Sequence, residues 1–146
     1  MKPFSLETVL AYRKRLADMA QQRFLEACRV HRQVEERLAE EHELLRQLSE
    51  ESERRQRQGM GITDLIRFEE RILQVKANIA AIAKNLEEKA RQVASEQQQL
   101  ARRVKERQIM ERLKERQNRA WAIHLEKKET AMLDEIAILR HDSQEK

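Results

Sequence analysis

Residues 58–64 read QGMGITD and contain both glycines of the 146-residue chain, Gly59 and Gly61. The only proline is Pro3, so no other strong helix breaker occurs between it and the C-terminus. Because a glycine-rich segment between two long periodic stretches marks a connection, the sequence predicts two long helices joined by one turn.

The same segment indicates how each helix ends. Gly59 can adopt the left-handed backbone conformation that commonly follows the last residue of a helix. Thr63 or Asp64 offers a side-chain oxygen that can cap the first turn of the next helix. The expected bounds are about 5–57 for the first helix, about 58–63 for the hairpin loop and about 64–141 for the second helix.

Apolar residues recur at alternating spacings of three and four on both sides of the loop, which is the heptad pattern of a coiled coil. In the first helix the stripe comprises Leu6, Leu10, Arg13, Ala17, Ala20, Phe24, Ala27, His31, Val34, Leu38, Glu41, Leu45 and Leu48. In the second it comprises Leu65, Phe68, Ile72, Val75, Ile79, Ile82, Leu86, Ala90, Val93, Gln97, Leu100 and Val104. A stripe of this period predicts left-handed supercoiling.

A short connection makes the two helices antiparallel neighbours, with facing residue numbers that sum to roughly 120. The predicted pairs are Leu48 with Ile72, Leu45 with Val75, Leu38 with Ile82, Val34 with Leu86, Ala27 with Val93, Ala20 with Leu100, and Leu10 with Met110. The two stripes then meet along their length. We therefore expect an all-α fold, two long helices forming an antiparallel coiled-coil hairpin, as a single domain over residues 1–146 and as a monomer.

The second helix is expected to be longer than the first. At 1.5 Å per residue it extends about 39 Å further and forms a C-terminal helical overhang. Trp121 lies in this overhang. At the other terminus, Phe4, a Ser5 cap and Val9 have the spacing of a hydrophobic staple.

The composition argues against a globular enzyme. The chain has 30 Lys and Arg, 26 Asp and Glu and only five aromatic residues, and two helices offer no enclosed pocket. The four histidines have no second ligand at metal spacing, and the single Cys28 has no intramolecular disulfide partner. We expect no catalytic residue, no metal and no cofactor. No apolar run is long enough for a bilayer, so we expect a soluble protein. The lack of a secretory signal and the single cysteine favour the cytoplasm.

Charge is distributed unevenly along the chain. Residues 1–32 carry seven basic and three acidic side chains, and residues 88–119 carry ten and five. Residues 33–87 carry nine basic and twelve acidic side chains, and residues 120–146 carry four and six. The predicted hairpin brings its two basic segments together. The cations of the second are expected around the whole circumference of its helix, as a shaft inside an acidic ring would present them.

Two other functions fit parts of the pattern. The basic block at residues 102–119 precedes Leu125, Met132 and Leu139 at intervals of seven, as in a leucine zipper with a basic region. Three glutamates inside that block would meet phosphates, so we expect no nucleic-acid binding, although a basic coiled-coil scaffold or zipper-like protein is the alternative. Residues 4–20 could also form a membrane-surface helix instead of the start of the coiled coil.

Nearly the whole chain resembles the FliJ family of flagellar type III export proteins, which is related to the YscO-type stalk proteins of injectisomes. The resemblance rests on four stretches in this order: Phe4-Ser5-Leu6 with Val9-Leu10 and Arg13; Gly59-Met60-Gly61; Glu111-Arg112-Leu113-Lys114-Glu115; and Leu133-Asp134-Glu135-Ile136-Ala137 with Arg140. The order of these stretches, the total length and the single break together carry the resemblance.

The resemblance implies a non-catalytic stalk and adaptor of the export apparatus, at the cytoplasmic face of the inner membrane. Its implied partners are the hexameric export ATPase, the cytoplasmic domain of the large export-gate membrane protein, and export chaperones. The residues expected to contact the ATPase ring are Arg13, Arg103, Arg107, Arg112, Arg116 and Arg119. Those expected to contact the gate, near the hairpin, are Arg37, Leu44, Leu48 and Val75.

Overall fold

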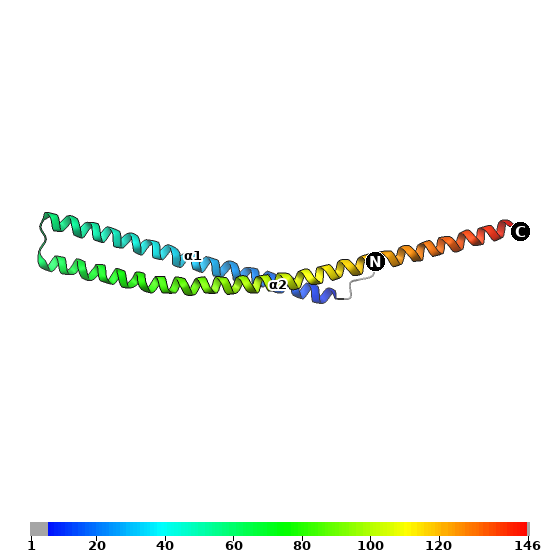
Figure 1. Ribbon diagram of the computed structural model, residues 1–146, viewed down its shortest axis with the longest axis horizontal. Helices are drawn as coiled ribbons and strands as arrows, with labels where there is room; N and C mark the ends of the chain where they lie inside the picture. The colour runs from blue at the N-terminus through cyan, green and yellow to red at the C-terminus, as the bar shows by residue number, and fades with distance from the viewer. Residues whose placement is uncertain (1–5, 146) are drawn as a thin grey trace. The chain divides into compact units, whose positions relative to one another are not determined.

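The computed structural model describes residues 6–145, which form two helices and a short loop (Figure 1). Helix α1 comprises Glu7–Gln58 and helix α2 comprises Ile62–Glu145. Residues 6–145 contain no strand. The two helices pack against each other, which confirms the predicted all-α helical hairpin.

The loop residues account for the ends of the two helices. Gly59 follows the last residue of α1 with a φ of 94°, as predicted, and its N–H donates to the carbonyl of Gln56. The predicted cap of the second helix is wrong, because α2 begins at Ile62 and Thr63 already lies in its first turn. The N–H of Leu65 donates to the carbonyl of Gly61 over 3.1 Å, so the helical hydrogen bonds begin at the second glycine.

The chain divides into two compact units, and the first to be described contains residues 20–100. It holds the loop and the two arms of the hairpin on either side (Figure 1). The seam between the arms follows the predicted stripe on α1, with Ala20, Ala27, Val34 and Leu48 buried. Phe24, His31, Leu38, Glu41 and Leu45 on the same stripe are half-buried.

On α2 the seam departs from the predicted stripe after Leu86. Ala90 and Gln97 are exposed, and Lys89 and Glu96 are half-buried instead. These two charged residues continue the strict seven-residue repeat of Val75 and Ile82, whereas Ala90 and Gln97 lie one residue out of phase with it. Val93 and Leu100 stay half-buried on the seam, as predicted. Long charged side chains can cover apolar surface with their stems while their charged ends stay in water, so the seam tolerates them.

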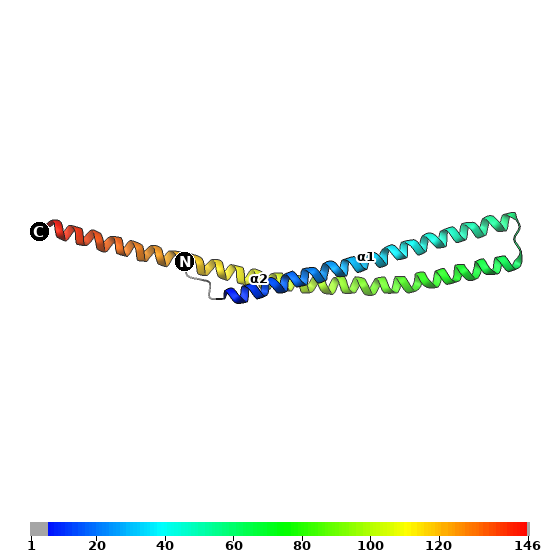
Figure 2. The same cartoon turned by 180° about the vertical axis from the view of Figure 1, so that it is seen from behind.

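The other unit contains residues 6–19 and 101–145. Here the first turns of α1 lie beside α2 in both views (Figures 1 and 2). Leu10 and Met110 form a buried cluster, as the predicted register requires. Ala17 is also buried, whereas Leu6 is exposed. The proposed staple of Phe4 and Ser5 lies outside the described residues.

Past Trp121, α2 continues without a neighbour from residues 6–19 of this unit. All side chains from Ala122 to Gln144 are exposed, so the expected overhang is present. This stretch exposes several large apolar residues, namely Ile123, Leu125, Met132, Leu133, Ile136, Ile138 and Leu139. Across residues 6–145, neither helix contains a stretch sufficiently apolar to span a bilayer.

Candidate protein-binding surface

The cations of residues 102–119 lie on two faces of α2, not around its whole circumference as predicted. At about 100° per residue they divide into two sectors. Arg103, Arg107 and Lys114 form one sector and are half-buried. The other sector is exposed and consists of Arg102, Lys105, Arg112, Arg116 and Arg119. We call these five residues the cationic edge.

The inner sector is occupied by contacts within the chain. Arg103 pairs with Glu106 at 3.1 Å, and Arg107 pairs with Glu111 at 3.5 Å. Lys114 forms an ion pair with Glu7 of α1 at 3.2 Å. These cations therefore help to organise this part of the coiled coil, and they are less available to a partner.

Arg13 of α1 makes a second connection between the helices of this unit. Its Nη1 donates to the backbone carbonyl of Glu106 over 3.1 Å. A carbonyl inside a helix already accepts a backbone N–H, and the guanidinium uses its second lone pair. Arg13 is thus a seam residue whose guanidinium is hydrogen-bonded to the facing backbone. This hydrogen bond explains how an arginine can occupy a position in the apolar stripe.

The cationic edge differs from the inner sector because none of its five side chains forms an ion pair or hydrogen bond within residues 6–144. Successive members are separated by three, four or seven residues, so they share one side of the helix. Glu106 and Glu115 border this side of the helix. Glu106 is paired with Arg103, and Glu115 is exposed. The edge is a row of solvated positive charge that no carboxylate of residues 6–144 pairs with.

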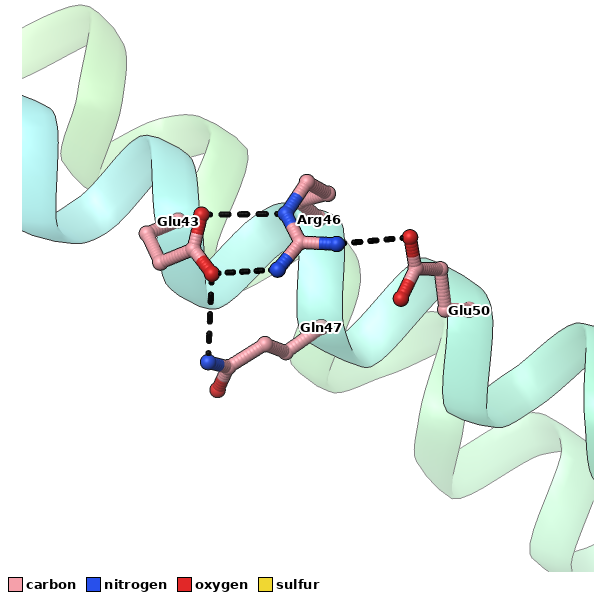
Figure 3. A network of polar contacts seen from close by, with 4 residues as sticks. All are labelled: Glu43, Arg46, Gln47 and Glu50. Atoms are coloured by element: carbon pink, nitrogen blue, oxygen red, sulfur yellow. Dashed lines mark hydrogen bonds and ion pairs between the residues drawn. The ribbon is translucent and has the colours of Figure 1, made fainter.

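The charged side chains of the other unit are arranged differently. Arg46 donates to Glu43 through Nε at 3.0 Å and Nη2 at 2.5 Å, and through Nη1 to Glu50 at 2.7 Å (Figure 3). Gln47 also donates to Glu43. Hydrogen bonds from Arg46 lower the pKa of the Glu43 carboxyl and raise the pKa of the guanidinium itself.

Two similar clusters occur along α1. Glu51 accepts from Arg54 and Arg55, and these hydrogen bonds lower the pKa of its carboxyl. Glu26 accepts from Arg29, with the same effect on its pKa. Much of the charge on this arm is therefore neutralised locally, unlike the charge of the cationic edge.

The four residues expected to contact the export gate fall into two groups. Leu48 and Val75 are 7% and 4% exposed and belong to the seam, so their side chains pack inside the coiled coil. Leu44 is half-buried beside the seam, and Arg37 is exposed. Arg37 and Leu44 are one heptad apart and share a face of α1, which leaves them as the accessible pair.

Sequence reasoning missed an apolar surface close to the loop. Ile62, Ile66 and Leu73 of α2 are all exposed. The sequence contained a signal for this surface, because the three residues are apolar at positions outside the seam where polar residues are expected. These residues lie out of phase with the seam, so the heptad stripe does not include them.

The histidines and the cysteine have ordinary surroundings. His31 Nδ1 lies 3.3 Å from a carboxylate oxygen of Glu35, and His124 stacks on Trp121 with ring centroids 5.4 Å apart. Cys28 is a free thiol, half-buried beside the seam. Among the residues that the structure describes, no three histidine, cysteine or carboxylate side chains are grouped as metal ligands would be.

The fold and the cationic edge together define the class of this protein. It is a coiled-coil hairpin with a row of unpaired cations on its surface. The family model described as "Flagellar FliJ protein" matches residues 1–146, the whole chain. The protein therefore belongs to the FliJ family, whose members are non-catalytic cytoplasmic components of the flagellar export apparatus. No curated protein and no solved structure gives a significant match.

Proposed function

We infer that this protein is the central-stalk and adaptor component of the flagellar type III export apparatus. Without catalysing a reaction itself, it binds the hexameric export ATPase, the cytoplasmic domain of the large export-gate membrane protein, and export chaperones. It acts as a monomer in the cytoplasm, and binding to the gate brings it to the cytoplasmic face of the inner membrane. It requires no metal or cofactor, and nucleic acid is not among its partners.

The observation that carries this proposal is the cationic edge. Unpaired surface cations raise the rate at which an acidic partner is captured, and they lose little by desolvation compared with buried ones. Arg112, Arg116 and Arg119 form no contact within the described residues that a partner would have to break. They lie just before the overhang, where an encircling ring could contact them.

The six residues expected at the ring thus have two roles in the proposal. Arg112, Arg116 and Arg119 contact the ATPase directly. Arg13, Arg103 and Arg107 support that contact indirectly, because their pairs hold the first turns of α1 against α2 or order α2 itself.

For the gate, the proposal assigns direct contact to Arg37 and Leu44. Leu48 and Val75 contribute by packing the two arms together, since their side chains are buried. The exposed Ile62, Ile66 and Leu73 form a separate apolar surface on α2 near the loop, which a gate domain could also cover.

Charge reversal tests the ring contact. The triple variant Arg112→Glu, Arg116→Glu and Arg119→Glu is expected to lose at least nine-tenths of the stimulation that the wild-type chain gives to the purified export ATPase. Circular dichroism should remain fully helical, because all three side chains are exposed. The readout is the rate of ATP hydrolysis against the concentration of added protein.

A matched triple variant provides the control. Arg67, Arg71 and Lys76 are also exposed cations of α2 with no ion pair among the described residues, but they lie near the loop. Their reversal to glutamate should leave stimulation intact. Equal loss of stimulation in both variants would mean that the effect comes from net charge alone. Unchanged stimulation by the first variant would contradict the ring contact.

A further inference from the structure

A second apolar stripe runs along the first turns of α1, beside the seam. Val9, Tyr12, Leu16 and Met19 are separated by three, four and three residues, which is again heptad spacing. Leu16 is half-buried and the other three are exposed, with Tyr12 at 53%. The seam itself uses Leu10, Arg13 and Ala17, so this second stripe has no partner on α2.

Helix α2 adds two exposed apolar residues to the same side. The contact between Leu10 and Met110 fixes the register of this unit. In that register Leu113 falls beside Val9, and Ile109 falls beside Tyr12. Val9 and Leu113 directly flank the seam, and Tyr12 and Ile109 lie one position further out on the same side, which both helices of an antiparallel pair share.

We call the surface formed by Val9, Tyr12, Leu16, Met19, Ile109 and Leu113 the apolar flank. Single exposed apolar side chains are normal on a protein surface, but here five exposed ones and the half-buried Leu16 gather on one side of a two-helix coiled coil. Two parallel stripes with heptad spacing are what one helix presents when it packs with two others. The geometry is therefore that of a three-helix bundle with one helix missing.

The border of the apolar flank is positively charged. Arg102 and Arg116 lie one heptad before and after Ile109 on the same face, and both are exposed. Arg15 lies over the ring of Tyr12, with its Cζ 5.9 Å from the centroid. Glu106 is on this side as well, but it is half-buried and its carboxylate is paired with Arg103.

We propose that the apolar flank binds a single amphipathic helix from another protein, with acidic residues on both sides of its apolar stripe. The apolar stripe would fill the space between the two helices, in the mode by which amphipathic helices bind hydrophobic surfaces. Its acidic borders would meet Arg15, Arg102 and Arg116. A second copy of this chain is a poor occupant, because its own flank has the same cationic border.

A synthetic peptide of three heptads serves as the probe. It carries leucine at both apolar positions and glutamate at the flanking positions, so that repulsion between its own glutamates keeps it monomeric at neutral pH. Fluorescence anisotropy of the labelled peptide against the full-length protein is expected to show saturable binding that weakens as salt is raised. A peptide with lysine in place of glutamate should bind at least tenfold more weakly.

The double variant Tyr12→Ala and Ile109→Ala should weaken binding of the acidic peptide at least tenfold. Both side chains are more than half exposed, so helix content by circular dichroism should not change. The matched control is Leu25→Ala with Ile123→Ala, which removes a similar exposed apolar area outside the flank and should leave binding unchanged.

Three results would overturn the proposal. The acidic and basic peptides could bind equally, or the flank variant could bind like its control. Sedimentation could also show a dimer that the flank variant dissociates, which would make the flank an interface between copies. The assay contains no ATPase, so its failure would leave the proposed stalk function to be judged by the charge-reversal experiment alone.

Discussion

Leu10 and Met110 lie against each other in the core although one is in the first turns of α1 and the other is near the middle of α2. They are 1% and 4% exposed, and Leu10 is the largest fully buried side chain among the described residues. The polar pairs around them keep the same register, with Glu7 facing Lys114 and Arg13 facing the backbone of Glu106. This contact holds the first turns of α1 on α2.

Replacement of Leu10 by alanine should release those turns. Large-to-small changes at buried positions cost about 2 to 5 kcal/mol, and a two-helix seam is expected near the lower end of that range. Hydrogen exchange should show faster exchange at residues 6–19, with little change around the loop. Leu6→Ala is the control, because Leu6 is 41% exposed. Equal protection in Leu10→Ala and wild type would show that the contact contributes little.

The seam between Leu86 and Leu100 gives a second prediction. Lys89 and Glu96 are half-buried seam residues, whereas Ala90 and Gln97 are exposed. The double variant Lys89→Leu and Glu96→Leu should therefore raise the melting temperature, through an added burial of about 1 kcal/mol per side chain. Thermal denaturation followed by circular dichroism measures the effect.

The paired control for this seam is Ala90→Leu with Gln97→Leu. These leucines would lie outside the seam, and the melting temperature should stay within a degree or two of the wild type, since surface substitutions usually change stability by less than about 0.5 kcal/mol. If this control stabilised the protein more than the seam variant, the register of α2 in this stretch would be different.

The same stretch shows how far the sequence determines the fold. Two glycines and a heptad stripe were sufficient for the helices, the turn and the pair of Leu10 and Met110. Between Leu86 and Leu100 the repeat keeps an apolar residue at Val93 but has charged residues at 89 and 96, and the sequence alone favoured Ala90 over Lys89. In the structure Lys89 occupies the seam instead, because the helices keep their register and the apolar stem of a lysine can lie between them.

The sequence predicted which residues form the candidate site, but not the side of α2 on which each of them lies. The sequence identified the basic residues of segment 102–119, yet it could not separate Arg107 from Arg112. Whether a given arginine lies beside the seam or in solvent depends on which side of α2 faces α1 near Met110. The apolar flank escaped notice for the same reason, since Tyr12 and Ile109 become neighbours only in the folded register.

The carboxylates bonded to arginine predict a dependence of stability on pH. The pKa values of Glu43 and Glu51 are lowered from their usual 4.5 in the folded chain. A lowered carboxyl pKa stabilises the fold above the unfolded value, and this contribution is lost as the pH falls through the folded value. The melting temperature should therefore decrease as the pH is lowered from 6 toward 3.

A substitution separates these clusters from the general effect of acid. In Arg46→Gln the pKa of Glu43 should return toward its usual value, because the hydrogen bonds from the guanidinium lower it. The melting temperature of this variant should fall less between pH 6 and pH 3 than that of the wild type. Arg32→Gln, an exposed arginine of α1 with no ion pair within the described residues, is the control. Identical pH profiles for all three proteins would contradict the prediction.

The two glycines of the loop should respond differently to alanine. Gly59 has a φ of 94°, where a side chain strains the backbone, whereas Gly61 has no such conformation and an added Cβ would meet nothing within 4 Å. Gly59→Ala should lower the free energy of unfolding by about 1 kcal/mol, because alanine is disfavoured at positive φ. Gly61→Ala should be neutral or slightly stabilising, since alanine reduces the freedom of the unfolded chain. Urea denaturation of both variants measures the difference, and equal midpoints would mean that the turn does not require the left-handed conformation.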